Sequence, residues 1–306
     1  MLLKNGQEIT IGCDPEFFLF NKERKRNESA HKLIPGDKKN PYKVDGGAIQ
    51  VDGTAVEFNI DAAKTSDEFA TNVQSVLGYL RKTIPDKFEF EFTPAIHYNK
   101  KYFENLPEFT KELGCDPDFN AYTGAVNPKP PADKVGTMRT GSGHIHIGWT
   151  KDADITDPHH IWDCQMVVKN LDAYFSYFSH FWDNDKERTK LYGAAGAYRP
   201  KSYGVEYRVL SNAWLKYPEI HKWLFDSCVF IMQNLSNGHN YEYSHMRKPG
   251  LVAAYQWAGK SKKLFFEGVA RYSPFYIGPR MPVIESWTPA FNPELYSGLE
   301  SKRAYF

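Results

Sequence analysis

Residues 139–148 read RTGSGHIHIG, in which two histidines separated by one residue follow two glycines. Side chains alternate between the two faces of an extended strand, so His144 and His146 project to one side and the isoleucines next to them project to the other. The glycines allow the backbone to bend and a ligand to approach it closely, because they carry no Cβ. This pattern is typical of a metal or phosphate site on a sheet. An isolated pair of this kind, however, is more often two unrelated histidines on a surface strand.

The composition predicts a globular protein of one or two domains. The chain has 306 residues, including 21 Phe and 19 Tyr, and 25% of its residues are charged, which argues against a disordered or fibrous class. The formal net charge of +1 argues against global electrostatic capture of nucleic acid or of an anionic membrane. A local basic patch remains open.

Cysteine usage and hydropathy predict a cytoplasmic protein. The cysteines are scattered and form no C-x-x-C pair, as expected for reduced thiols (Cys13, Cys115, Cys164 and Cys228). No apolar run approaches the ~20 residues of a membrane span, and the first residues lack the apolar centre of a secretory signal. We therefore expect no membrane partner.

Further polar residues alternate with apolar ones in the segments 9–20, 48–60 and 205–209. The first segment places Asp14 and Glu16 on one face, with Pro15 between them favouring an edge or a bulge. Two like charges so close repel each other on a partly buried face unless a cation neutralises them, and the alternative is a solvated strand face. The same alternation places Glu57 on the polar face of segment 48–60 and Glu206 on the polar face of segment 205–209.

These patterns predict an α+β fold. Its centre is a curved antiparallel β-sheet whose polar concave face is the site and whose convex face is packed by helices, expected at residues 66–83, 158–181 and 218–235. We expect a catalytic domain over residues 1–238, with a mobile basic loop at 22–45 that is either a lid or a solvated loop. The aromatic and Pro-rich region 239–306 is expected to complete the domain or to shape substrate specificity.

The candidate ligands are mostly hard oxygen atoms with one nitrogen, which suits Mg²⁺ or Mn²⁺ better than a structural zinc. They are Asp14, Glu16, Glu57, Glu206 and His144. Three arginines, Arg188, Arg199 and Arg208, are suited to hold phosphate oxygens or a substrate carboxylate. Metals and arginines without an evident nucleophile indicate phosphoryl transfer.

Three motifs resemble those of glutamine synthetases, in the same order along the chain. Residues 12–20, GCDPEFFLF, resemble the E-x-E-F-F strand with Asp in place of the first Glu. Residues 141–146, GSGHIH, are similar to G-S-G-x-H-x-H but lack one residue before the first His. Arg199 with the residues 206–208, EYR, resembles the arginine-bearing segment that ends in E-x-R. The length of the chain and the sequence YGVEYR at residues 203–208 more closely resemble those of the phage and mobile-element amidoligases (COOH-NH2 ligases), relatives of glutamate-cysteine ligase.

The resemblance implies a glutamine synthetase-like catalytic domain that uses ATP and two or more Mg²⁺ or Mn²⁺ ions. It implies that Glu16 and Glu57 ligate the metal nearer the acceptor, and that the metal on the nucleotide phosphates is ligated by Asp14, His144 and Glu206. Nucleotide-binding positions would be Gly141, Ser142, Gly143, His146 and Arg208. Residues acting on the transferred phosphoryl group or the substrate would be Arg188, Arg199, Arg208 and His146.

The function expected from this resemblance is an ATP-dependent carboxylate-amine ligase that forms an amide or isopeptide bond through an acyl phosphate. Its partners would be a small-molecule or peptide carboxylate and an amine, in the host cytoplasm if the protein is phage-encoded. Nucleic acid is not expected as a partner, but a modified nucleotide is open as a substrate. Three alternatives stay open: a nucleotide-independent metal hydrolase using His144 and His146, an amine or guanidino kinase, and a non-catalytic nucleotide-binding relative.

Overall fold

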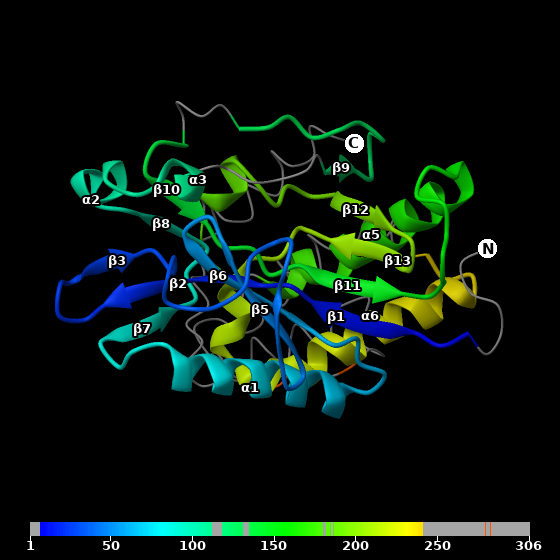
Figure 1. The fold of residues 1–306 in the computed structure, drawn as a ribbon. Coiled ribbons are helices and arrows are strands. Elements are labelled where there is room, and N and C mark those ends of the chain that lie inside the picture. Colours follow the sequence, from blue (N-terminus) through cyan, green and yellow to red (C-terminus); the bar gives the residue numbers. More distant parts are fainter. Residues whose placement is uncertain are drawn as a thin grey trace, which may run out of the picture.

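The chain passes directly from β1 (Thr10–Cys13) into β2 (Glu16–Asn21), and these two strands belong to different sheets. In Figure 1 they follow one another across the molecule as one long blue ribbon. The computed structural model describes residues 7–111, 118–130, 135–179, 182, 183, 185, 187–240, 279 and 282. The predicted C-terminal region 239–306 therefore lies almost wholly outside the described residues.

The remaining strands are short and are separated by turns and helices. They are β3 (Arg26–Glu28), β4 (Tyr42–Val44), β5 (Gly47–Asp52), β6 (Ala55–Ile60), β7 (Phe88–Glu91), β8 (Ala95–His97), β9 (Phe119–Asn120), β10 (Met138–Thr140), β11 (Ile145–Gly148), β12 (Ala197–Lys201) and β13 (Gly204–Tyr207). The helices are α1 (Ser66–Thr83), α2 (Lys100–Glu104), α3 (Glu108–Lys111), α5 (Pro158–Phe178) and α6 (His221–Ser236), with 3-10 turns at η2 (Arg188–Lys190), η3 (Asn212–Lys216) and η4 (Pro218–Ile220).

The strands form open antiparallel sheets, so the fold is α+β as predicted. A five-stranded sheet has the order β1-β11-β13-β12-β9, and a six-stranded sheet has the order β3-β2-β6-β5-β4 with β7 also paired to β2. A separate ribbon pairs β10 with β8. The single curved sheet expected from the sequence is therefore wrong: the polar segments are divided between two sheets.

The division occurs at Asp14 and Pro15, where the predicted strand 9–20 is broken in two. The nitrogen of Pro15 carries no hydrogen and cannot extend the ladder. At this point the backbone bonds to both sides: the Glu16 amide donates to the Ser142 carbonyl at 2.9 Å, whereas the Pro15 carbonyl accepts from the amide of Phe58 in β6 at 3.2 Å. The chain thereby leaves β11 as its neighbour and takes β6 instead.

The histidine strand, β11, is the second strand of the five-stranded sheet and lies between β1 and β13. His146 of β11 is opposite Gly12 of β1 and opposite Glu206 of β13. Ile145 and Ile147 point into the core and are fully buried. The predicted alternation is confirmed, and the polar face of these strands is the face that carries the site.

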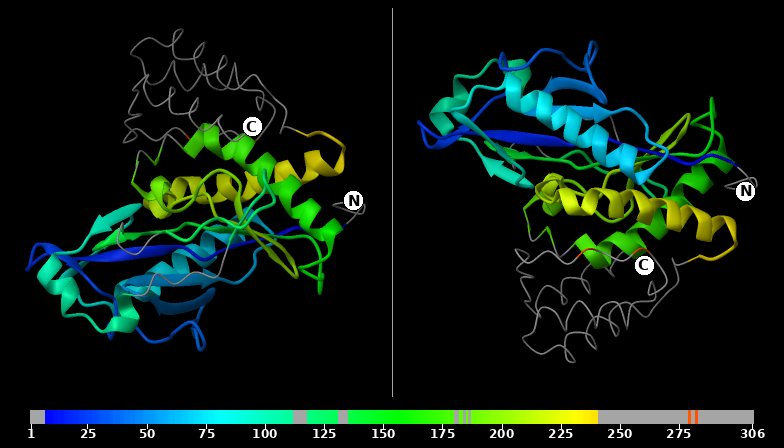
Figure 2. Two further views of the ribbon diagram at one scale, coloured as in Figure 1. Left: turned by 90° about the horizontal axis from the view of Figure 1, so that it is seen from above. Right: turned by 90° about the horizontal axis from the view of Figure 1, so that it is seen from below.

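Three long helices cover the apolar side of the sheets. The helix α1 packs on β5 and β6, α5 packs on β12 and β13, and α6 lies between α1 and α5 (Figure 2). The N-cap of α1 is Thr65, one residue before the predicted helix range, and its hydroxyl accepts from the Glu68 amide at 3.2 Å. The apolar stripe of this helix is buried (Phe69, Val73, Val76, Leu77 and Leu80).

The basic segment 22–45 is not one long loop, which corrects the prediction. It contains β3, which pairs with β2, and β4, which pairs with β5. Glu28 anchors β3 because its carboxylate forms ion pairs with Arg24 at 3.1 Å and with Arg26 at 2.9 Å. Intervening turns complete the segment.

Two further findings bear on the sequence predictions. Within the described part of the chain, no helix combines the length and apolar character that crossing a membrane requires. The three described cysteines are buried free thiols (Cys13, Cys164 and Cys228), as predicted, whereas Cys115 lies outside the described residues.

Candidate active site

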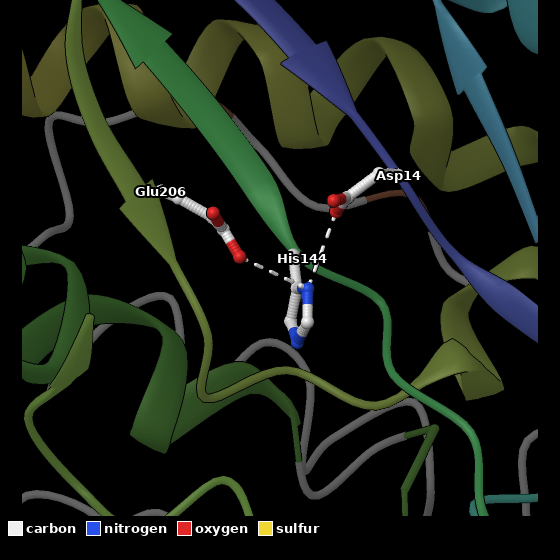
Figure 3. A group of neighbouring side chains, drawn as sticks. All are labelled: Asp14, His144 and Glu206. Carbon is white, nitrogen blue, oxygen red and sulfur yellow. Dashed lines mark ion pairs between the residues drawn. The ribbon is translucent and has the colours of Figure 1, made fainter. Parts of the chain in front are cut away.

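A first group of ligand atoms lies where the two sheets meet and comprises Asp14, His144 and Glu206 (Figure 3). Asp14 comes from the junction of β1 and β2, His144 precedes β11, and Glu206 lies in β13. The Nδ1 atom of His144 is 3.2 Å from Asp14 Oδ1 and 3.5 Å from Glu206 Oε1. Three residues that are far apart in the sequence thus offer one ligand atom each within 4.8 Å of one another.

The imidazole of His144 is held in its neutral form. Burial and the nearby Arg208 lower the pKa of His144 to about 4, although Asp14 and Glu206 act in the opposite direction. Neutral imidazole is the form that ligates metals. The electrostatics of the site therefore fit a ligand role for this histidine.

Asp14 and His146 form a close, buried ion pair. Asp14 Oδ1 is 3.0 Å from His146 Nε2, and both atoms are buried. The other ring nitrogen of His146, Nδ1, contacts the Tyr203 hydroxyl. Burial opposes protonation of His146, but Asp14 outweighs burial and raises the pKa of His146, so this contact favours a carboxylate paired with a protonated imidazole.

A second group of ligand atoms comprises Glu16, Asp52 and Glu57. Glu16 of β2 is directly opposite Glu57 of β6, and Asp52 ends β5, the strand next to β6. Glu57 Oε2 is buried without a hydrogen-bond partner in the described part of the chain. The Nζ atom of Lys38 lies 2.8 Å from Asp52 Oδ2, so one basic side chain already faces this group.

The carboxyl groups of the second group oppose one another's ionisation. Burial and then Asp52 raise the pKa of Glu16 to about 7. Burial and Glu16 raise the pKa of Glu57 well above its usual range. Near neutral pH these groups cannot all be ionised unless a cation neutralises them. The donor set of both groups, oxygen atoms with one imidazole nitrogen, fits Mg²⁺ or Mn²⁺.

Glu206 is surrounded by basic side chains. One carboxylate oxygen contacts Arg208, and the other lies 2.8 Å from Lys201 Nζ and 3.3 Å from Arg199 Nη1. Burial and Asp14 oppose ionisation of Glu206, but its basic neighbours outweigh them and lower its pKa to about 2. Glu206 is thus a permanent carboxylate that would have to exchange one basic partner for a metal ion.

A cleft of about 670 Å³ opens beside both groups. It is lined by acidic and basic side chains together, among them Glu16, Asp52, His144, Arg139, Arg188 and Arg208. The guanidinium of Arg188 donates to the carbonyls of Val209 at 2.8 Å and Arg208 at 3.3 Å. Arg199 and His146 are not among the lining residues, and neither are Asp14 and Glu206.

The glycines before the histidines have a packing reason. A Cβ on Gly141 would lie 2.2 Å from the Asn212 side chain, and one on Gly143 would lie 2.1 Å from the Ser211 carbonyl. These two segments therefore run too close together for any side chain. Between the glycines, the Ser142 amide donates to Glu16 Oε2 at 3.2 Å. That the glycines make room for a nucleotide stays a prediction.

Several residues of the site were not predicted as site residues. Asp52 could have been found, because Gln50 and Asp52 alternate in register with Glu57 across the turn at Gly53. Asp118, whose carboxylate lies 3.3 Å from Arg208 Nε, gave no pattern at all. Lys201 shares a strand face with Arg199, two residues away, which was the available signal. Tyr203 is the first residue of the YGVEYR motif, which by itself predicts no role for its hydroxyl.

The comparison with protein families gives one match. Residues 136–271 match the model of a family described as phage phiEco32-like COOH.NH2 ligase-type 2. No curated protein matches the chain. The matched segment contains His144, Glu206 and the three predicted arginines, whereas Asp14, Glu16 and Glu57 precede it. Over residues 136–271, somewhat less than half of the chain, the sequence is therefore similar to the amidoligase branch of the carboxylate-amine ligases.

Proposed function

We propose that the protein is an ATP-dependent ligase that joins a carboxylate to an amine through an acyl phosphate, with two Mg²⁺ or Mn²⁺ ions. The observation that carries this proposal is the pair of ligand groups at the junction of the two sheets, both beside one cleft that also contains arginines. The family match independently supports a carboxylate-amine ligase. ATP use and the acyl phosphate are our extension of that match.

The proposed reaction has two steps. A carboxylate oxygen of the first substrate attacks the γ-phosphorus of ATP, the bond to the bridging oxygen breaks, and ADP leaves. The amine nitrogen then attacks the acyl carbon, inorganic phosphate leaves, and the amine gives up a proton. Both steps develop negative charge on phosphoryl oxygens, which positioned cations stabilise.

The chain's own residues have distinct roles in this scheme. Asp14, His144 and Glu206 would hold one ion, and the second would be held by Glu16, Asp52 and Glu57. When bound, the ions neutralise phosphate oxygens and polarise the acyl oxygen. Arg208 lines the cleft and is held from both sides by Glu206 and Asp118, so its guanidinium is oriented before the phosphoryl group arrives.

The test uses hydroxylamine as a general amine that traps acyl phosphates. The protein is incubated with ATP, Mn²⁺ or Mg²⁺, hydroxylamine and a panel of carboxylates, and ADP and hydroxamate are measured together. ATP binding is measured separately by calorimetry with metal present. We expect metal-dependent ATP binding and equal amounts of ADP and hydroxamate for at least one carboxylate.

A matched pair of variants makes the test specific. Glu16→Gln should reduce ADP release on the order of 10²-fold, whereas Glu28→Gln should not, since Glu28 pairs with Arg24 and Arg26 outside the site. Absence of ATP binding with either metal would overturn the proposal. A phosphorylated amine without hydroxamate would identify a kinase, and substrate cleavage without nucleotide would identify a hydrolase.

A further inference from the structure

A tight turn at residues 36–40 carries Lys38 to the second ligand group. The Nζ atom of Lys38 lies 2.8 Å from Asp52 Oδ2, and the Lys38 side chain is half exposed while that of Asp52 is mostly buried. Burial opposes protonation of Lys38, but its contact with Asp52 and the charges of Glu57 and Glu16 outweigh burial and raise its pKa. The lysine therefore acts on the whole group.

The turn is built to hold this position. Asp37 and Asn40 exchange two backbone hydrogen bonds of 3.2 and 3.1 Å. The Asp37 carboxylate also accepts from the amides of Lys39 at 2.8 Å and Asn40 at 2.9 Å. Such closure by an aspartate fixes the conformation of a short turn. Lys38 lies at its tip.

The turn is also fastened to the strand that carries Asp52. The Gly36 carbonyl accepts from the Val51 amide at 3.2 Å. Gly36 has a φ of +89°, and a Cβ there would lie 2.3 Å from the Ile49 carbonyl, so only glycine permits this close approach. The backbone thus places Lys38 against the end of β5.

The charge balance of the group leaves room for more positive charge. Three carboxyl groups each offer one oxygen atom within 4.8 Å of the others. The Oε2 atom of Glu57 is buried with no hydrogen-bond partner among the described residues. One ammonium on Asp52 offsets only part of the negative charge. A divalent cation would offset more, but it would compete with Lys38 for Asp52.

We infer that Lys38 is a built-in counter-cation of the Glu16, Asp52 and Glu57 group, and that a divalent cation entering the group displaces its ammonium from Asp52. Occupancy of the site is thereby coupled to the turn at residues 36–40. This inference rests on the metal-binding part of the proposed function and concerns neither ATP nor the identity of the substrates. It assigns Lys38 the role of a positioning residue that competes with the metal.

The test is the direction in which Mn²⁺ affinity changes. Binding is measured on the full chain by calorimetry, and free Mn²⁺ by electron paramagnetic resonance, without nucleotide and at one fixed pH. Removing the competing ammonium in Lys38→Met should tighten Mn²⁺ binding, by about tenfold for a partly exposed charge. Asp52→Asn removes a ligand oxygen and should weaken it.

Controls separate this effect from net charge and from misfolding. Lys39→Met removes the neighbouring exposed lysine of the same turn, whose bond to Asp37 uses the backbone amide, and should leave Mn²⁺ affinity within twofold. Lys38→Gln should repeat the result of Lys38→Met. Without metal, Lys38→Met should melt at a lower temperature than the wild type, and Mn²⁺ should remove most of that difference.

A second readout follows the turn itself by hydrogen exchange of peptides that cover residues 34–40. In the wild type, exchange should rise when Mn²⁺ is added, whereas in Lys38→Met it should be fast with and without metal. Equal or weaker Mn²⁺ binding by Lys38→Met, with Asp52→Asn still impaired, would overturn this inference and leave the proposed function standing. Absence of Mn²⁺ binding by the wild type would overturn the inference and the metal part of the proposed function together.

Discussion

Glu16 of β2 and Glu57 of β6 are directly opposite each other across two antiparallel strands. Like charges in that relationship destabilise a sheet. Burial and then Glu16 raise the pKa of Glu57, and burial and then Asp52 raise the pKa of Glu16. The fold retains this unfavourable pair at the edge of the cleft. Residues that lower the folding stability of a protein are often kept because they serve its function.

We therefore expect Glu57→Gln to stabilise the metal-free protein. The substitution keeps the shape of the side chain and removes the repulsion with Glu16, which should add about 1 kcal/mol and raise the melting temperature by roughly 2 to 4 °C. Mn²⁺ binding should weaken at the same time. The measurement is thermal unfolding with and without Mn²⁺, with the exposed Glu89→Gln of β7 as control. A lower melting temperature in the metal-free variant would contradict the expected repulsion.

Arg208→Lys should inactivate the protein although it preserves the charge. The guanidinium contacts Glu206 through Nη1 and Asp118 through Nε, and a lysine ammonium cannot hold both carboxylates in that geometry. We expect metal-dependent ATP turnover to fall on the order of 10²-fold, with the circular dichroism spectrum unchanged. Arg81→Lys on the exposed face of α1 is the control. Retention of more than a third of the activity would show that charge alone suffices at this position.

Gly143→Ala should destabilise the fold. A Cβ on Gly143 would lie 2.1 Å from the Ser211 carbonyl and 2.4 Å from the Trp214 indole nitrogen, and neither group can move without disturbing the core. Overpacking of this kind costs about 3 kcal/mol or more, which denaturant unfolding will measure. The matched change Gly78→Ala, in α1 where a Cβ meets nothing within 4 Å, should instead add about 0.5 to 1 kcal/mol. Equal effects of the two alanines would refute the packing explanation.

The stability of the protein should fall on acidification because of His221. This ring is fully buried against Trp214, neither of its nitrogens has a hydrogen-bond partner among the described residues, and burial lowers its pKa to about 4. The unfolded chain, with a histidine pKa near 6.5, binds a proton first. The stabilisation is therefore complete above about pH 6.5 and is lost as the pH falls toward 4, by about 2 to 3 kcal/mol at pH 4.5.

Urea unfolding at pH 7 and pH 4.5 isolates this contribution. His221→Phe keeps an apolar ring beside Trp214 but cannot titrate, so its loss of stability between the two values should be smaller by that amount. His159→Gln, on the exposed first turn of α5, should behave like the wild type. Parallel pH profiles for His221→Phe and the wild type would exclude His221 as the titrating group.

Local alternation predicted the strands of the site well, because it depends only on the extended backbone. It placed Asp14 with Glu16 and separated Glu206 from its apolar neighbours. It could not predict that Pro15 divides one strand between two sheets, since that outcome depends on which distant strand pairs on each side. For the same reason, the partners of Glu206 were not foreseen: Lys201 and Arg199 reach it across a hairpin.

The grouping of the ligands came from the family resemblance and not from the residues alone. The structure brings Asp14, His144 and Glu206 together, and separately Glu16 and Glu57, as the resemblance implied. Whether these groups bind metal, and whether Arg188, Arg199 and Arg208 act on a phosphoryl group, stay predictions. Asp118 was beyond reach, because its contact with Arg208 joins residues ninety positions apart without any repeating pattern.

The passage from one sheet to the other at Asp14 and Pro15 also fixes a length. One ligand of each group sits on either side of a single proline, so two residues of extended backbone, about 6 to 7 Å, separate the Cα atoms that support them. This distance is fixed by covalent bonds. Bending of the sheets or movement of surface turns can change the direction from one Cα atom to the other but cannot lengthen the distance. Inserting one residue beside Pro15 would lengthen the distance between the Cα atoms of Asp14 and Glu16 and would turn one carboxylate to the opposite face.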